Sequence, residues 1–246
     1  LASPKKIYVI GVAGSVMGGM ACLLAEQGHQ VQGSDRDCYP PMSTRLARAG
    51  IKVHLGFDGT RLEKERPDIV LVGNITRRDN PEAKAMRALS IPHMSLPEML
   101  NTMLLRTRKS LTIAGTHGKT TTTSMVVWLL QQAGRAPGFM VGGIPMGFET
   151  GFRGGAGAHF VLEADEYDTA YFDKRPKFVH YLPDAGVLTS VEFDHADIYP
   201  DFEAIKKAFR TYTRLFPEGA PLWIHSANDE AIKTAEAAGG NAKLLR

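Results

Sequence analysis

The sequence predicts an α/β protein with two parallel-sheet domains, the first Rossmann-like and the second similar to a P-loop NTPase. Short apolar strands alternate with helices along the chain, and the connections between them are short. A glycine-rich turn follows the first strand of each half, at residues 11–19 and at residues 115–118. The charged stretch 106–109 separates the halves, so we place the domains at residues 1–107 and 108–246.

Composition and charge narrow the possible partners. The 246 residues carry a net charge of +3, without a basic stripe interleaved with aromatic residues, so we expect no nucleic-acid partner. No apolar run approaches membrane-spanning length, so we expect no membrane partner. Cys22 and Cys38 lack metal-ligand spacing and suit a reducing compartment, which favours the cytoplasm. The small excess of positive charge is compatible with the binding of phosphorylated small molecules.

The first glycine-rich turn follows a strand at 6–10 and leads into a helix at about 16–27. Its glycines depart from the G-x-G-x-x-G spacing, but a second strand, 30–34, leads to Asp35, where such folds place an acid near a ribose hydroxyl. We expect a diphosphate-binding site here, although Asp35 alone would also suit a polar turn. The candidate binding residues are Gly11, Ala13, Gly14, Ser15, Met17, Gly18, Ser34 and Asp35.

A polar loop follows the buried strand at residues 68–73. Ligands of open α/β sheets bind outside the carboxyl ends of the strands. We therefore expect Asn74, Thr76 and Asn80 to contact a sugar or a phosphate. Arg77 and Arg78 either join them or remain solvated loop charges.

The second glycine-rich turn lies in LTIAGTHGKTTTTSMV (111–126), which reads as strand, turn and helix. Glycines let backbone N–H groups approach an anion, and the following helix N-terminus adds its positive end. Lys119 is expected against the β- and γ-phosphates, and the Thr120 hydroxyl on Mg²⁺. The general eight-residue pattern requires glycine at position 113, where this chain has Ile113, so only the core GTHGKT is present. The alternative is a strand, turn and helix without a ligand.

Two polar clusters follow later strands. Four carboxylates in EADEYD (163–168) come directly after the strand 159–162 and require a cation or a basic partner. Glu163, at the strand end, is where a Mg²⁺ site would be built from oxygen ligands. His195 lies between Asp194 and Asp197, next to the strand 187–190, and is a candidate ligand. The alternative is a structural histidine, the more common use of a lone histidine. Further elements are expected as a strand at 178–181 and an amphipathic helix at 201–215.

Three motifs in order resemble the central-domain signatures of the Mur ligase family: AGTHGKTTTT (114–123), EADEYD (163–168) and DHAD (194–197). GVAGSVMGGMA (11–21) and GSD (33–35) resemble the family's UDP-binding domain. The resemblance covers essentially the whole chain. It implies that the fold consists of the family's N-terminal and central domains, the latter incomplete, without the C-terminal domain that binds the incoming amino acid or peptide.

The resemblance also implies a chemistry. The carboxylate of UDP-N-acetylmuramate attacks the γ-phosphate of ATP, and an amine then displaces phosphate from the acyl phosphate. Lys119, Glu163 and His195 would be catalytic, and two Mg²⁺ ions would be held by Thr120, Glu163 and His195. Gly11, Gly14, Ser15 and Gly18 would cradle the UDP diphosphate, with Ser34 and Asp35 near the uridine. The implied ATP-binding residues are Gly115, Thr116, His117, Gly118, Lys119, Thr120 and Thr121.

Finer similarity favours one branch of the family. YPPMST (39–44), residues 166–181 and VEFDHADIY (191–199) resemble the bacterial ligases that attach L-alanyl-γ-D-glutamyl-meso-diaminopimelate, the murein tripeptide, in peptidoglycan recycling. Ser190 stands where the family usually has asparagine. Lys174 and Arg175 either meet an anionic substrate or cover the surface.

Three alternatives stay open: an L-alanine ligase of the same family, a non-catalytic nucleotide-binding module, and a nicotinamide-dependent oxidoreductase. The oxidoreductase is suggested only by the first glycine-rich turn and leaves Lys119 and His195 unexplained. Without the acceptor-binding domain, this fragment is expected to be inactive by itself. The sequence does not determine the oligomeric state.

Overall fold

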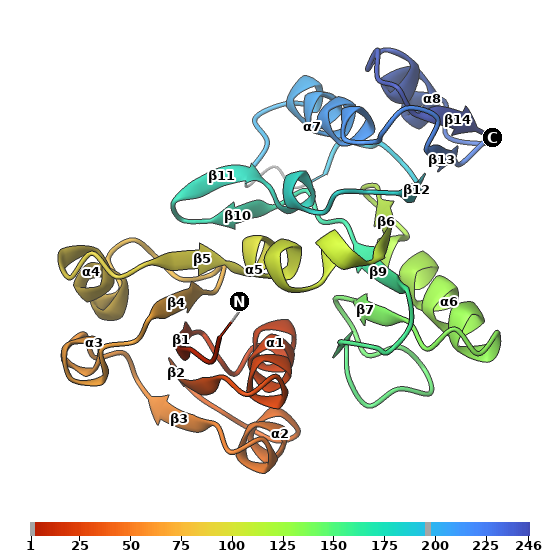
Figure 1. Cartoon of the computed structure of the whole chain (residues 1–246). Helices are drawn as coiled ribbons and strands as arrows, with labels where there is room; N and C mark the ends of the chain where they lie inside the picture. Colours follow the sequence, from red (N-terminus) through yellow and green to blue (C-terminus); the bar gives the residue numbers. More distant parts are fainter. Residues whose placement is uncertain (1–2, 195–197) are drawn as a thin grey trace. The chain divides into compact units, whose positions relative to one another are not determined.

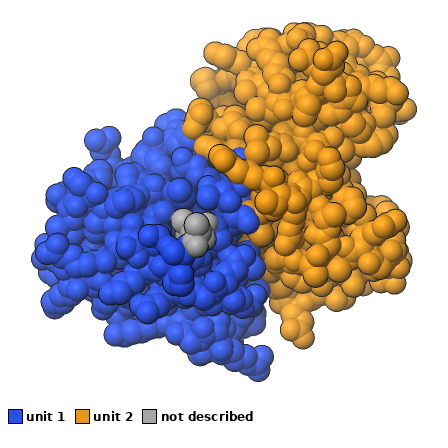
Figure 2. Space-filling view, in the orientation of Figure 1, with its two compact units in different colours: residues 1–103, 168–174 blue, residues 104–167, 175–246 orange. Residues whose placement is uncertain are grey.

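The computed structural model describes residues 3–194 and 198–246. The chain forms two compact units: unit 1 contains residues 1–103 with 168–174, and unit 2 contains residues 104–167 with 175–246 (Figure 2). The predicted α/β class is confirmed in both units. No helix in the described part of the chain is long and apolar enough to cross a membrane.

Unit 1 is built on a five-stranded parallel sheet with the order β3-β2-β1-β4-β5 (Figure 1). Helices α1 and α2 pack together, and so do α3 and α4. Apolar β-branched residues fill the central strands because helices cover parallel sheets on both faces. The elements are β1 (Lys6–Ile10), α1 (Ser15–Glu26), β2 (Gln30–Asp35), α2 (Met42–Arg48), β3 (Lys52–Leu55), α3 (Thr60–Glu65), β4 (Ile69–Val72), α4 (Pro81–Ala88), β5 (His93–Ser95) and α5 (Leu96–Met103).

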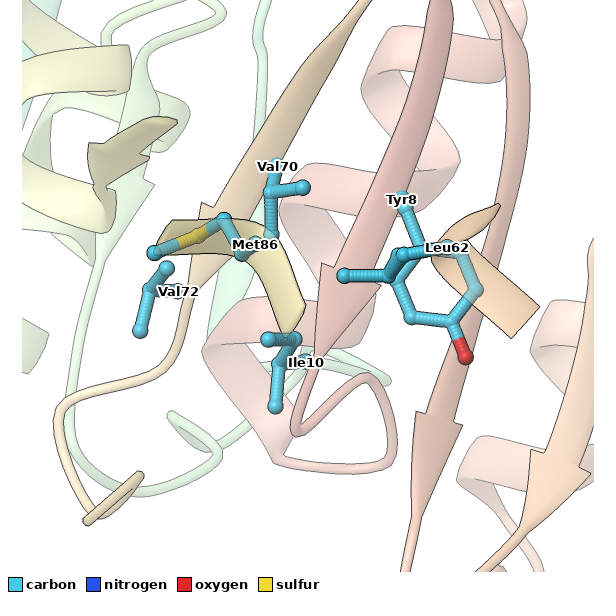
Figure 3. Packing of buried hydrophobic residues seen from close by; sticks show 6 residues of the cluster. All are labelled: Tyr8, Ile10, Leu62, Val70, Val72 and Met86. Carbon is cyan, nitrogen blue, oxygen red and sulfur yellow. The ribbon is translucent and has the colours of Figure 1, made fainter. Parts of the chain in front are cut away.

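The core of unit 1 includes a cluster between β1, β4, α3 and α4 (Figure 3). Alternate residues of one strand face this cluster, because side chains of a strand alternate between its two faces. The cluster fixes α4, and therefore the start of that helix, against the sheet. Its buried members are Tyr8, Ile10, Leu62, Val70, Val72 and Met86.

Unit 2 contains a seven-stranded sheet with the order β14-β13-β12-β6-β9-β7-β8, in which only the β7–β8 pair is antiparallel. A separate two-stranded sheet, the hairpin β10–β11, lies mostly in unit 1, which contains residues 168–174. The elements are η1 (Leu105–Thr107), β6 (Lys109–Ala114), α6 (Lys119–Gln132), β7 (Gly138–Met140), β8 (Phe152–Arg153), β9 (His159–Glu163), β10 (Asp168–Ala170), β11 (Asp173–Pro176), η2 (Lys177–His180), β12 (Ala185–Leu188), α7 (Phe202–Arg214), β13 (Pro221–Ile224), α8 (Asp229–Glu236) and β14 (Lys243–Leu245).

The strand predicted at residues 178–181 is wrong: these residues lie in and after the 3₁₀ helix η2. Phe178 and Tyr181 are both fully buried and stand three residues apart. In a 3₁₀ helix, residues i and i+3 lie on the same face, whereas a strand would place them on opposite faces. The Phe178 ring packs against Phe209 and Tyr212 of α7, which fixes this turn under the helix.

Candidate active site

The second glycine-rich turn joins β6 to α6, as predicted from the sequence. Gly115 has φ +136°, and a Cβ atom there would lie 2.1 Å from the Thr189 hydroxyl oxygen, so only glycine fits. Gly118, at φ +80°, is the N-cap of α6 and makes no side-chain capping bond. The first N–H groups of α6 have no acceptor within the helix, which suits them to bind an anion.

The residues that follow β12 hold this turn in shape. The Ser190 hydroxyl accepts the His117 amide at 2.9 Å and lies 3.0 Å from the Thr116 hydroxyl. The Thr189 hydroxyl donates to the carbonyls of Ala114 and His117. A serine at position 190 therefore still makes a polar contact with the turn. The sequence analysis noted Ser190 as a replacement of the usual asparagine but did not single out Thr189. The partners of both residues are more than 70 residues away in the chain.

Lys119 is bound within the turn and to the acidic segment. Its ammonium donates to the carbonyl oxygens of Gly115 and Thr116, at 2.6 and 3.3 Å. It also lies 3.0 Å from both carboxylate oxygens of Glu166, which is almost fully buried. Burial raises the pKa of Glu166 above its ordinary value, and the charge of Lys119 opposes that rise.

Three of the four carboxylates at residues 163–168 pair with a lysine, as the sequence analysis expected of this acidic segment. Asp165 pairs with Lys177 at 2.7 Å, Glu166 with Lys119, and Asp168 with Lys174 at 2.7 Å. Within the described residues, Glu163 is the one without a cationic partner. This singles out Glu163 as the carboxylate able to take a metal ion.

The oxygen atoms around Glu163 fit Mg²⁺. One carboxylate oxygen accepts the Thr120 hydroxyl at 2.8 Å, and the other accepts the Gly142 amide at 2.7 Å. The described residues contain no cluster of three or more His, Cys, Asp or Glu side chains able to hold a metal. Mg²⁺ commonly takes one or two protein oxygens and completes its shell with phosphates and water, so the oxygens of Thr120 and Glu163 are candidate ligands. His195, predicted as a catalytic residue and metal ligand, lies outside the described residues.

These side chains surround one cavity of about 450 Å³. The sequence-predicted ATP-binding residues from Thr116 to Thr121 line it together with Glu163, and Asp165 and Tyr167 also contribute. A second cavity, of about 710 Å³, shares His117 and Gly118 with the first. Its other walls include Trp223 and Asn228, which the sequence analysis did not single out. The turn thus stands between two hollows of unit 2.

The glycine-rich turn of unit 1 is held in a similar way. Gly11 has φ +86° and begins the turn after β1. Its amide and that of Val12 donate to the Ser34 carbonyl, at 2.8 and 3.1 Å, and the Ala13 amide donates to the Asp35 carboxylate at 2.8 Å. The predicted binding residues Gly14, Ser15, Met17 and Gly18 lie at the N-terminus of α1, whose N-cap Gly14 makes no side-chain capping bond. The N–H groups of the first turn of α1 are therefore the ones placed to meet an anion.

Two of the predicted sugar or uridine contacts, Ser34 and Asn80, have other side-chain partners in this structure. The Ser34 side chain is fully buried and donates to Glu82, so it points into the protein. Asn80 caps α4 by accepting the amides of Glu82 and Ala83, at 2.9 and 3.2 Å. Thr76 is buried, whereas Asn74 is exposed. Their contacts with a ligand remain predictions.

Comparison with known proteins assigns both units. Residues 6–108 match the family described as "Mur ligase family, catalytic domain", and residues 113–244 match the "Mur ligase middle domain". The chain belongs to the Mur ligase family. The matches span both glycine-rich turns and the acidic segment, so the resemblance seen in the sequence motifs is confirmed.

Among Mur ligases, the chain is similar to UDP-N-acetylmuramate–L-alanyl-γ-D-glutamyl-meso-2,6-diaminoheptandioate ligases. It is 47% identical to that of Escherichia coli K12 over 95% of this chain and 51% of the relative, and 43% identical to that of Haemophilus influenzae over 96% and 51%. The crystal structure of the corresponding Neisseria meningitides ligase has a TM-score of 0.90 at 40% identity, over 98% of this chain and 77% of that chain. The chain spans about half the length of these curated relatives.

Proposed function

We propose that the chain is the UDP-N-acetylmuramate- and ATP-binding part of a ligase that joins UDP-N-acetylmuramate to L-alanyl-γ-D-glutamyl-meso-diaminopimelate. The observation that carries the ATP-dependent chemistry is the meeting of Lys119, Thr120 and Glu163 around one cavity beside the N-terminus of α6. A phosphate clamp and a Mg²⁺ site at one place are what phosphoryl transfer requires. The hypothesis of a nicotinamide-dependent oxidoreductase does not explain this arrangement of Lys119, Thr120 and Glu163.

In this mechanism, the residues of the chain position and neutralise the reacting groups. The α6 amides and Lys119 hold the β- and γ-phosphates of ATP while the carboxylate of UDP-N-acetylmuramate attacks, which gives an acyl phosphate and ADP. Thr120 and Glu163 would hold Mg²⁺, which when bound neutralises charge on the phosphate oxygens. Glu163 and His195 would hold a second ion. The amine of the tripeptide then attacks the acyl carbonyl, and inorganic phosphate leaves.

The second cavity is a suitable place for the base of ATP, because it adjoins the phosphate turn at His117 and Gly118. Trp223, which is 47% exposed, offers an aromatic surface, and Asn228, whose amide oxygen caps α8, also lines this cavity. Pockets of this kind combine apolar walls with a few polar groups that fix orientation. The other ligand, UDP-N-acetylmuramate, would bind at the first turn of α1.

The tripeptide is favoured over L-alanine as the acceptor by degree of similarity. The UDP-N-acetylmuramate–L-alanine ligase of Syntrophomonas wolfei is 38% identical over 87% of this chain, below the 47% and 43% of the two tripeptide ligases. The bacterial cytoplasm is the proposed compartment, because ATP and UDP-sugars are available there. A turnover assay at the length of the relatives, with ATP, Mg²⁺, UDP-N-acetylmuramate and either acceptor, should yield product with the tripeptide. Product with L-alanine alone would overturn the choice.

Calorimetry on the 246-residue chain tests the two binding sites separately. We expect UDP-N-acetylmuramate to bind without Mg²⁺, and ATP to bind more tightly with Mg²⁺ than with EDTA. NADH, as the matched control, should not bind. Tight NADH binding without UDP-N-acetylmuramate binding would favour an oxidoreductase and overturn the ligase. Binding of both nucleotides without any turnover at the relatives' length would favour a non-catalytic binding module.

A further inference from the structure

Glu82 is a fully buried carboxylate in the first turn of α4. One of its oxygens accepts the Tyr8 hydroxyl at 2.8 Å, Arg61 Nη1 at 3.2 Å and the Asp58 amide at 3.3 Å. The other oxygen accepts the Ser34 hydroxyl. Burial raises the pKa of Tyr8, so its hydroxyl remains a donor at neutral pH. One buried carboxylate thus joins α4 to β1, β2, α3 and the loop before α3.

The bond to Ser34 leads directly to the diphosphate turn of unit 1. Ser34 stands near the end of β2, and its backbone carbonyl accepts the amides of Gly11 and Val12. These two residues begin the turn that leads into α1. Glu82 therefore fixes the side chain of Ser34, and the backbone carbonyl of Ser34 fixes the turn. A glycine-rich turn has few interactions of its own that fix its shape, so outside contacts determine it.

An ion pair is a poor means of stabilising a core. Replacing a buried pair with apolar side chains of similar volume is often neutral or stabilising, because desolvation offsets the attraction of the charges. Glu82 accepts the hydroxyl of Tyr8, a member of the apolar cluster that includes Leu62 and Met86, so apolar packing would be available to a side chain at position 82. What a carboxylate provides that a methyl group does not is a fixed acceptor with several lone pairs. We therefore expect the Glu82 carboxylate to fix the geometry of its hydrogen-bond partners rather than to stabilise the fold.

We infer that Glu82 is a positioning residue for UDP-N-acetylmuramate binding, acting through Ser34 on the turn at Gly11 and Val12. The inference rests on the proposed function, since it takes this turn as the diphosphate site. Glu82 touches no ligand itself. Its role is to keep the start of α1 in the conformation that meets the diphosphate.

The test uses Glu82→Gln, Ser34→Ala and the double variant, with UDP-N-acetylmuramate affinity measured by calorimetry. Glu63→Gln, at an exposed position of α3, is the matched control. Because both changes act on the same link between Glu82 and Ser34, we expect each single variant to lose about tenfold in affinity, the scale of one hydrogen bond, and the double variant to lose no more than about tenfold. A loss of about a hundredfold in the double variant would show independent effects and overturn the inference.

A second measurement does not depend on the ligand. Amide hydrogen exchange of Gly11 and Val12 in the unliganded chain should be faster in Glu82→Gln than in the wild type, while exchange of Thr116, in unit 2, should be unchanged. Unchanged exchange at Gly11 and Val12 would overturn the inference. If the wild type itself fails to bind UDP-N-acetylmuramate, the proposed function fails, and the exchange result still decides whether Glu82 positions the turn. Ser34→Ala removes only one oxygen atom and serves if Glu82→Gln does not fold.

Discussion

Lys119 Nζ lies 3.0 Å from both carboxylate oxygens of Glu166, and the Glu166 side chain is 1% exposed. The lysine proposed to bind the phosphates of ATP therefore also forms an ion pair with a buried carboxylate. Its ammonium must be shared with, or released to, the incoming phosphates. The ion pair with Glu166 and the proposed binding of phosphate therefore use the same Lys119 ammonium. Mutation can separate its contribution to stability from its contribution to ATP binding.

Lys119→Met should destabilise unit 2 by about 3–5 kcal/mol, the cost of leaving one partner of a buried ion pair uncompensated. Adding Glu166→Gln should recover much of that loss, because no buried charge then remains unpaired. Both variants should lose ATP binding, because neither carries the ammonium. Denaturant unfolding and calorimetry together check this. Equal stability of Lys119→Met and the wild type would contradict the buried pair, and retained ATP affinity would remove Lys119 from the phosphate site.

Thr120→Val keeps the shape of the side chain and removes the hydroxyl that lies 2.8 Å from Glu163. We expect the benefit of Mg²⁺ for ATP binding to fall by about tenfold, since one of the two protein oxygens proposed for the ion is lost. The measurement is calorimetry with Mg²⁺ and with EDTA. Thr211→Val, at a half-buried position of α7 where the hydroxyl donates to the Lys207 carbonyl, is the control, and its Mg²⁺ effect should equal that of the wild type. An unchanged Mg²⁺ effect in Thr120→Val would place the ion elsewhere.

Gly142→Ala should weaken the Mg²⁺ effect as well. A Cβ atom at position 142 would lie 3.2 and 3.3 Å from the two Glu163 carboxylate oxygens, so the carboxylate would have to shift by a few tenths of an ångström. Gly143→Ala is the matched control, because its Cβ would meet the Thr120 methyl group at an ordinary 3.6 Å. Calorimetry of Mg·ATP distinguishes the two variants. Equal affinity in both would show that Glu163 does not depend on position 142.

Asn80→Ala should lower the free energy of unfolding by about 1 kcal/mol, because the N-cap of α4 is lost. Asn80→Asp should restore it, since aspartate caps a helix equally well. Thermal or urea unfolding checks both. If Asn80 also contacts the sugar, as the sequence predicted, Asn80→Asp will bind UDP-N-acetylmuramate more weakly in spite of normal stability. Unimpaired stability of Asn80→Ala would show that the cap contributes little.

The sequence predicted the architecture well where the signal was local. Strand, glycine turn and helix at residues 109–132 and at residues 6–26 follow from patterns within about 25 consecutive residues, and both were confirmed. The stretch at 178–181 was misread because four mostly apolar residues suit a strand or a 3₁₀ turn equally. The packing of Phe178 against α7 decided between them.

By itself, the sequence determined where the phosphate turns, the acidic segment and the alternating strands lie, because those features depend on neighbouring residues. Only the tertiary structure decided which carboxylate remains open to a cation. Lys119 and Lys177 pair with Glu166 and Asp165, and Glu163 is left with hydroxyl and amide donors. The tertiary structure also decided that the Ser34 hydroxyl points into the protein and donates to Glu82, which is 48 residues away in the chain. Such pairings are set by the packing of distant segments, and a linear pattern of residue types does not record them.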